Sequence, residues 1–196
     1  MPEADLGNRW LRQLPNALTV LRLILVPVFV VLLFWHPDQP LWRLASTIAF
    51  TVAIVTDFFD GRLARKYGLI SDFGKLWDPI ADKVLTGAAF VSLSILGELP
   101  WWVTLIILVR EWGITWMRVA MLKYGVMAAN AGGKLKTFLQ AVALIIYLLK
   151  ADTAFMEWLG YLTMGAAFVL TVVTGLMLVR EALVMRRQAA KGKDDA

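Results

Sequence analysis

Long apolar stretches alternate with short polar segments along the whole chain. Each of six stretches predicts a helix, because it ends at a proline, a glycine or a polar turn. A helix needs about 20 residues to cross a bilayer, and mildly polar helical residues extend each run toward that length. We therefore expect an all-α integral membrane protein with six transmembrane helices. The six apolar runs are Leu23–Trp35, Leu44–Phe59, Val84–Leu96, Leu99–Val109, Leu139–Leu149 and Phe155–Val179.

Two shorter segments flank these runs. Residues 1–15 mix apolar and cationic side chains in a pattern typical of a short amphipathic helix that lies in the membrane interface. Residues 187–196 are polar, and we expect them to form a cytoplasmic tail without regular structure. The remainder predicts a single membrane domain over residues 1–186, with its interfacial helix at the start.

Composition agrees with this class of protein. The chain is 59% hydrophobic and 18% charged, whereas soluble domains average about 45–50% apolar and about 25% charged residues. The composition therefore excludes a soluble globular domain. The absence of cysteine excludes a disulfide scaffold and a cysteine-ligated metal site.

The distribution of cations predicts the orientation in the membrane. Of the 20 lysine and arginine residues, Arg43 and Lys150 fall in segments that would face outward, and the others lie on or near the side of the two termini. Cationic loops mark the cytoplasmic side, so we expect both termini there. The net charge of +5 is then explained by topology and by attraction to anionic lipid, without nucleic acid as a partner.

Four aspartates lie at the cytoplasmic ends of the second and third predicted helices. Asp57 and Asp60 are three residues apart, and Asp78 and Asp82 are four apart, so each pair shares a helical face. A turn between the helices would make them antiparallel and let the four carboxylates converge. Hard oxygen ligands without histidine or cysteine favour Mg²⁺, Mn²⁺ or Ca²⁺. The pattern predicts a two-metal site able to hold a phosphate.

Small residues and a cation accompany these acids. Gly61 and Ala64 would leave room for a ligand beside Asp57, and Arg65 can bind a phosphate through two N–H donors. Asp72 is either a solvated loop acid or a fifth carboxylate near the metals.

Structural explanations of the acids remain open at this point. Asp78 precedes Pro79 and could cap a helix that begins with that proline. Asp57 and Asp60 could instead pair with nearby arginines, either Arg62 or Arg65.

Residues Asp57–Asp82 match the signature D-x2-D-G-x2-A-R-x8-G-x3-D-x3-D at every fixed position, and on this motif the chain resembles the CDP-alcohol phosphatidyltransferases. Further segments are similar to the bacterial branch of the family that makes phosphatidylglycerol phosphate: Leu14–Arg22, Asp78–Lys83, Arg110 with Glu111 and Arg118, and Gly133–Thr137 with Gln140.

The resemblance implies a function. A phosphatidyl group would pass from CDP-diacylglycerol to sn-glycerol 3-phosphate, and CMP would leave. It also implies six membrane helices around a polar cavity open to the cytoplasm, a homodimer, and the bacterial inner membrane as location. Asp57, Asp60 and Asp78 would bind the Mg²⁺ or Mn²⁺ ions, and Asp82 would contribute to that site and act as the general base. Residues that would line the CDP pocket are Gly61, Ala64, Arg65 and Gly74.

Cations in the second half of the chain suit an anionic acceptor. The resemblance places Arg110, Arg118, Lys134 and Lys136 beside the acceptor. Two simpler interpretations stay open: Glu111 and Arg118 lie seven residues apart and could form an internal ion pair, and the two lysines could be ordinary cytoplasmic loop charges.

Other functions fit parts of the pattern. The same family includes enzymes with other acceptors, such as cardiolipin synthase or inositol-phosphate-type enzymes, and acids within helices also occur in divalent-cation transporters. Against transport, no acidic stripe continues from the cytoplasmic end to the outer face.

The sequence has no G-x-S-x-G motif, and its one histidine, His36, lies in an outward loop. We therefore expect direct attack by the acceptor, without a covalent enzyme intermediate.

Overall fold

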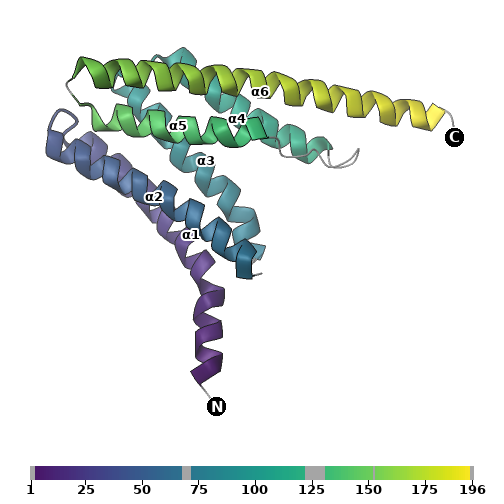
Figure 1. Ribbon diagram of the computed structural model, residues 1–196, viewed down its shortest axis with the longest axis horizontal. Helices are drawn as coiled ribbons and strands as arrows, with labels where there is room; N and C mark the ends of the chain where they lie inside the picture. Colours follow the sequence, from purple (N-terminus) through teal and green to yellow (C-terminus); the bar gives the residue numbers. More distant parts are fainter. Residues whose placement is uncertain (1–2, 68–71, 122–130, 152, 195–196) are drawn as a thin grey trace. The chain divides into compact units, whose positions relative to one another are not determined.

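The computed structural model describes residues 3–67, 72–121, 131–151 and 153–194, with side chains described for residues 17–56, 80–121, 132–151 and 153–188. Every regular element in these ranges is a helix (Figure 1). Each predicted apolar run overlaps one of these helices in order, which confirms the all-α prediction. The helices are α1 (Glu3–Trp35), α2 (Pro40–Tyr67), α3 (Asp72–Ile95), α4 (Trp101–Met121), α5 (Ala131–Leu149) and α6 (Ala154–Asp194).

Local chemistry explains where α2 begins and α3 ends. Pro40 is the first residue of α2, a position where its missing N–H costs no helical hydrogen bond. After α3, Gly97 adopts a φ of +74°, a left-handed conformation that glycine tolerates best. The N–H of Glu98 then donates to the carbonyl of Leu93 at 2.9 Å, which closes the end of the helix. Glu98 is thereby fixed immediately beyond α3.

The chain divides into two compact units, Met1–Glu98 with Ile145–Ala151, and Leu99–Leu144 with Asp152–Ala196. In the first unit, α1 packs against α2 and α3, and α2 packs against α3. Phe29 and Phe50 join the first two helices through rings whose centroids lie 5.4 Å apart. The core of this unit is made by apolar side chains that are almost fully buried: Phe29, Leu33, Phe50, Ala53, Leu85, Ala89, Phe90 and Leu93.

In the second unit, α4 packs against α6. Trp102 of α4 contacts Phe168 of α6 edge to face, with ring centroids 5.3 Å apart. Ile107 and Ala167 are fully buried in the same unit. Polar residues are also buried there, among them Gln140 and Thr171, and they belong to the site described below.

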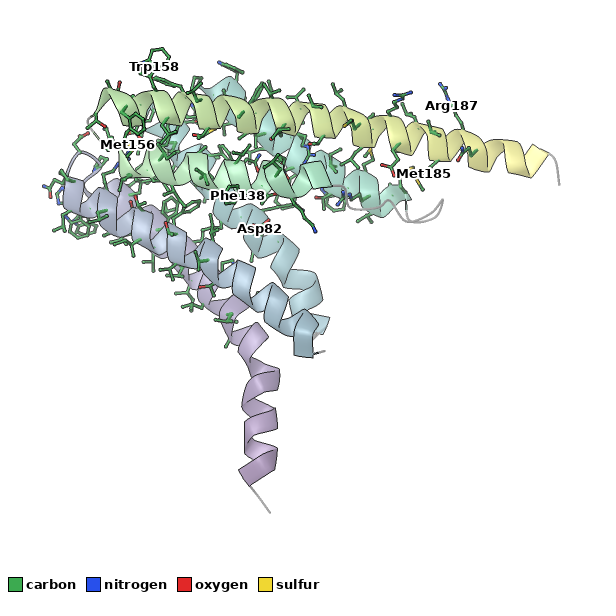
Figure 2. All side chains as sticks on the ribbon, in the orientation of Figure 1. Asp82, Phe138, Met156, Trp158, Met185 and Arg187 are labelled. Carbon is green, nitrogen blue, oxygen red and sulfur yellow. The ribbon has the colours of Figure 1, made fainter. Side chains whose placement is uncertain are left out.

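Large apolar side chains cover much of the described surface. Val109, Trp116, Trp158 and Leu176 are each about two-thirds exposed or more, and Trp158 projects outward from α6 (Figure 2). Water-soluble proteins rarely present so many such residues, whereas a lipid bilayer solvates them. The chain is therefore a membrane protein.

Three described segments are long and apolar enough to cross a bilayer: Ala17–Trp35, Gly132–Leu149 and Ala154–Gln188. Pro40–Thr56 of α2 is apolar but shorter. Helices α2, α3 and α4 carry charged residues of the predicted site, and these charges interrupt their apolar stretches. The six helices follow the six predicted spans in order, but three of them satisfy the length and composition of a span over their described residues, so the count of six spans stays a prediction.

Both ends of the described chain are helical. The expectation of an irregular tail is wrong, because α6 continues through the polar residues to Asp194. At the other end, residues 3–15 are helical but belong to α1 and do not form a separate short helix. The ribbon of α1 changes direction in its first half (Figure 1), and Pro15, whose ring does not fit a straight helix interior, lies in that half.

Candidate active site

The acidic motif occupies the end of α2 and the beginning of α3. Only residues 68–71 separate the two helices, so the motif lies on two consecutive helices joined by a short connection. Both segments are helical in backbone, and each aspartate pair therefore shares a face of its helix, as the spacing predicts. The end of α2 carries Asp57, Asp60, Gly61, Ala64 and Arg65, and the beginning of α3 carries Gly74, Asp78 and Asp82.

The structure removes one simpler explanation of these acids. Helix α3 begins at Asp72, so Asp78 lies inside the helix and does not cap it in front of Pro79. The same boundary places Asp72 at the first position of α3, and not in a loop. An aspartate in the interior of a helix gains nothing from capping, so the role of Asp78 must come from its surroundings.

Asp82 is the one member of the motif whose side chain is described. It is half-buried on α3 (Figure 2), between the buried neighbours Ala81 and Leu85. The hydroxyl of Thr86 donates to the carbonyl oxygen of Asp82 at 2.9 Å, which ties this turn of the helix together.

The described side chains contain no group of three or more residues able to hold a metal ion. Asp57, Asp60 and Asp78 lie outside these side chains, as do the predicted CDP-binding residues Gly61, Ala64, Arg65 and Gly74. The chemistry of the donor set fits a hard divalent cation, because all four acids offer oxygen and two adjoining helices carry them. The metal site stays a prediction.

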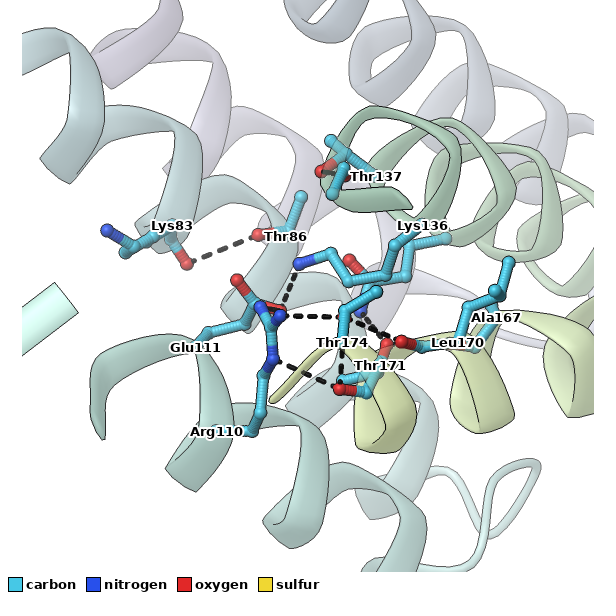
Figure 3. A network of polar contacts seen from close by, with 12 residues as sticks. Lys83, Thr86, Arg110, Glu111, Lys136, Thr137, Ala167, Leu170, Thr171 and Thr174 are labelled. Carbon is cyan, nitrogen blue, oxygen red and sulfur yellow. Dashed lines mark hydrogen bonds and ion pairs between the residues drawn. The ribbon is translucent and has the colours of Figure 1, made fainter. Parts of the chain in front are cut away.

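The second unit contains a buried polar network centred on Arg110 of α4 (Figure 3). Its Nε donates to the Thr171 carbonyl at 3.1 Å, and its Nη2 donates to the Thr174 hydroxyl at 2.8 Å, both on α6. Its Nη1 donates to Oε1 of Glu111 at 3.2 Å. All three guanidinium nitrogens are thus bound, and α4 is joined to α6.

Glu111 links this arginine to α5. Its Oε1 also accepts a hydrogen bond from Nζ of Lys136, so one carboxylate oxygen serves two cations (Figure 3). Gln140 lies one turn further along α5 and donates to the Thr171 hydroxyl at 3.1 Å. Three helices therefore meet in one hydrogen-bonded network, whose described charged members are two cations and one anion.

The four predicted acceptor cations fall into two groups. Arg110 and Lys136 belong to the network, and their side chains are 13% and 5% exposed. Arg118, in the last turn of α4, and Lys134, near the start of α5, are exposed. Lys134 and Lys136 are two residues apart, about 200° around the helix, so they lie on different faces of α5.

The possible ion pair between Glu111 and Arg118 is not what the structure contains. Among the described side chains, Glu111 pairs with Arg110 and Lys136. Spacing within one helix suggested Arg118 as the partner. The partner from α5 lies 25 residues away in sequence, beyond the reach of that argument.

Three residues of α6 complete the network and are not predicted by the sequence pattern: Thr171, Thr174 and Gly175. A Cβ added at Gly175 would lie 3.1 Å from Cγ of Arg110, so the glycine lets the arginine approach the helix closely. Two threonines three residues apart in the apolar stretch Met164–Val179 were the available signal. Arg22, a fully buried arginine of α1 in the other unit, lies in the segment Leu14–Arg22 that carries the resemblance, but the sequence predicts no role for it.

An open groove of about 600 Å³ lies between α4 and α6. Its lining is almost entirely apolar, with Leu105, Ile106 and Val109 on one wall, and Val172 and Leu176 on the other.

Comparison with known proteins agrees with the motif. A family model described as CDP-alcohol phosphatidyltransferase matches residues 12–176. That range includes the acidic motif on α2 and α3 and the network of α4, α5 and α6. The chain belongs to the CDP-alcohol phosphatidyltransferase family.

Curated relatives are similar over most of their length. A probable phosphatidylglycerophosphate synthase of Mycobacterium tuberculosis is 46% identical over 180 residues, which cover 90% of this chain and 85% of the relative. A CDP-diacylglycerol–glycerol-3-phosphate 3-phosphatidyltransferase of Rickettsia bellii is 38% identical over 170 residues, or 83% and 91% of the two chains. A protein of Bacillus subtilis with the same name is 37% identical over 147 residues, or 69% and 76%.

Proposed function

We propose that this protein transfers a phosphatidyl group from CDP-diacylglycerol to sn-glycerol 3-phosphate, yielding phosphatidylglycerol phosphate and CMP. The observation that carries the proposal is the match of residues 12–176 to the family, together with relatives from three bacterial genera whose names specify this reaction or its product. The acidic motif on α2 and α3 supplies residues suited to that chemistry.

In the proposed reaction, the primary hydroxyl oxygen of glycerol 3-phosphate attacks the phosphorus that carries diacylglycerol. The bond from that phosphorus to the bridging oxygen breaks, and CMP leaves with the electron pair. Asp82 accepts the proton of the attacking hydroxyl. Arg65 binds the diphosphate, while Gly61, Ala64 and Gly74 leave space for the nucleotide. No activated nucleophile is present in the sequence, which favours direct attack over a covalent intermediate.

We further propose that Asp57, Asp60, Asp78 and Asp82 hold two Mg²⁺ or Mn²⁺ ions. Such ions would neutralise the four carboxylates and stabilise negative charge on the diphosphate. Four uncompensated anions at membrane depth would each cost several kcal/mol, which supports a bound cation.

Acceptor recognition rests on cations. A phosphate monoester carries about −1.5 to −2 charges at pH 7, and the network of Arg110, Glu111 and Lys136 offers net positive charge inside a membrane protein. A buried charge in a membrane protein usually marks a functional site, because it is costly to keep there. Arg118 and Lys134 add positive charge at the ends of their helices.

We also propose six membrane spans, an interfacial segment at residues 1–15, and a single domain over residues 1–186, with 187–196 as a cytoplasmic tail. Both termini and the active site would face the cytoplasm at a bacterial inner membrane, since cations dominate that side. The protein would act as a homodimer, with its lipid substrate supplied from the bilayer.

An acceptor panel tests the function. Purified protein in liposomes that contain CDP-diacylglycerol would be given glycerol 3-phosphate, phosphatidylglycerol or inositol phosphate, and lipid products would be identified by mass spectrometry. We expect product only with glycerol 3-phosphate, with one CMP released per lipid formed. Cardiolipin from phosphatidylglycerol would assign the other acceptor. Cation flux through the liposomes without any lipid product would favour a transporter.

A further inference from the structure

The network of α4, α5 and α6 has one anion between two cations, and that anion has no role in the proposed reaction. Glu111 receives Nη1 of Arg110 and Nζ of Lys136 on the same oxygen, Oε1. Its side chain is 20% exposed, so it is partly withdrawn from solvent. Two buried cations close together would repel each other without it.

The arginine is held from both sides. Two of its nitrogens are bound to α6 through Thr171 and Thr174, and the third is bound to Glu111. Gly175 lets its side chain lie against α6. A guanidinium has five N–H donors, and these three bonds leave it able to bind phosphate oxygens without releasing its protein partners.

The lysine is the more flexible of the two cations. An ammonium on a flexible four-carbon stem has no fixed direction of its own, whereas a guanidinium is planar and preorganised. The carboxylate of Glu111, on α4, binds the ammonium of Lys136 on the same oxygen that accepts from Arg110, so the two cationic groups lie close together (Figure 3).

We propose that Glu111 is a positioning residue of the acceptor site, which holds the cationic groups of Arg110 and Lys136 in one place for the phosphate of the acceptor. The inference rests on the proposed function. The direction of the change in anion binding distinguishes this role from a purely electrostatic one. If Glu111 only reduced the positive electrostatic potential, its neutralisation would strengthen the binding of an anion. If it positions the cations, its neutralisation weakens that binding.

The test measures KM for glycerol 3-phosphate and for CDP-diacylglycerol separately, in Glu111→Gln and Thr174→Val. The first substitution removes a charge, and the second removes a hydrogen-bond partner of Arg110 without changing any charge. For Glu111→Gln, KM for glycerol 3-phosphate should rise about tenfold, as expected when a hydrogen bond between charged groups is lost. Thr174→Val should raise it by a smaller factor, and KM for CDP-diacylglycerol should change less than about twofold in both.

Three further variants or readouts make the result decisive. Glu111→Asp keeps the charge and should fall between wild type and Glu111→Gln. Arg187→Gln removes an exposed cation of α6 and should leave both KM values unchanged. Because KM does not depend on the concentration of active enzyme, partial unfolding of a variant does not imitate the predicted shift. If Glu111→Gln does not fold, the KM values of Glu111→Asp and Thr174→Val are compared with those of the wild type instead.

Contrary outcomes are distinct. A lower KM for glycerol 3-phosphate in Glu111→Gln, with no change in Thr174→Val, would show that Glu111 only reduces the positive electrostatic potential. Unchanged KM values in folded variants would make the network purely structural, and either result overturns the inference. If the wild type itself transfers nothing to glycerol 3-phosphate, the proposed function fails instead.

Discussion

Replacing Glu98 by glutamine should destabilise the protein strongly, although Glu98 lies far in sequence from the acidic motif. Its Oε2 accepts a hydrogen bond from Nη2 of Arg43 at 2.5 Å, and its Oε1 lies 3.1 Å from Nζ of Lys150. Arg43 is only 2% exposed, and its Nη2 also donates to the Tyr147 carbonyl at 3.2 Å. Glu98 therefore neutralises a buried guanidinium.

The magnitude follows from burial. At an effective dielectric constant of about 20, unit charges at these separations attract by about 5–7 kcal/mol, and desolvation cancels part of this gain. Removing one partner of a buried pair costs about 3–5 kcal/mol, because the other charge remains uncompensated. Glu98 is 17% exposed, and glutamine keeps an acceptor oxygen, so we expect the lower end, about 3 kcal/mol. For a chain of this size, Tm should fall by about 6–12 °C.

The assay is thermal unfolding in detergent, and Asp38→Asn is the matched control. Asp38 also pairs with Lys150, at 3.3 Å, but its side chain is 90% exposed. Exposed pairs contribute about 0–1 kcal/mol, so the control should change Tm by no more than about 4 °C. Equal decreases of Tm in the two variants, or an unchanged Tm for Glu98→Gln, would refute the argument from burial.

The same cluster predicts a dependence on pH. The hydrogen bond to Glu98 raises the pKa of Lys150 above its ordinary value of 10.5. The folded state therefore favours the ammonium, and this stabilisation is complete below the unfolded pKa and is lost as pH rises through the higher folded pKa. The Tm difference between wild type and Lys150→Met should be constant up to about pH 9.5 and shrink above about pH 10.5. It should be small, because the side chain is 43% exposed. A difference that grows with pH would contradict this sign.

Three other substitutions have clear expectations. Asp82→Asn should abolish turnover and leave CDP-diacylglycerol binding largely intact; near-normal turnover in the lipid-product assay would remove its role as base. Gly175→Ala places a methyl group 3.1 Å from Cγ of Arg110, which is held by its hydrogen bonds, and should lower the free energy of unfolding by about 1 kcal/mol. Gly165→Ala, on the same helix with no heavy atom within 4 Å of its added Cβ, should cost nothing. Equal melting curves for the two glycine variants would show that Arg110 moves freely.

Hydropathy predicts the apolar parts of the helices from the sequence, but not their charged ends. The run Leu44–Phe59 correctly located a helix, but α2 continues to Tyr67 through charged residues that hydropathy does not count. The irregular tail expected over residues 187–196 is wrong for the same reason: Arg187 is polar, yet arginine is a good helix former, and α6 continues to Asp194.

The site could be predicted where its residues are neighbours in one helix, and less well where they come together from distant segments. The aspartates stand at helical spacings, and their backbone segments are helical as expected. Glu111 was paired with Arg118 by its spacing, whereas its partner Lys136 comes from another helix. Arg43 and Glu98 are 55 residues apart in sequence. The distribution of cations predicts on which side of the membrane Arg43 lies, but it does not predict that Arg43 contacts Glu98.

The most direct test of the account is whether the acidic motif binds a divalent metal on which transfer depends. Purified protein stripped with EDTA would be titrated with Mn²⁺ and followed by electron paramagnetic resonance, with Asp60→Asn as the comparison and circular dichroism to verify its helices. The wild type should bind Mn²⁺ and regain phosphatidyl transfer as it does so, while Asp60→Asn should bind far less and stay inactive. Full transfer by the stripped protein, or equal Mn²⁺ binding by the variant, would contradict the account.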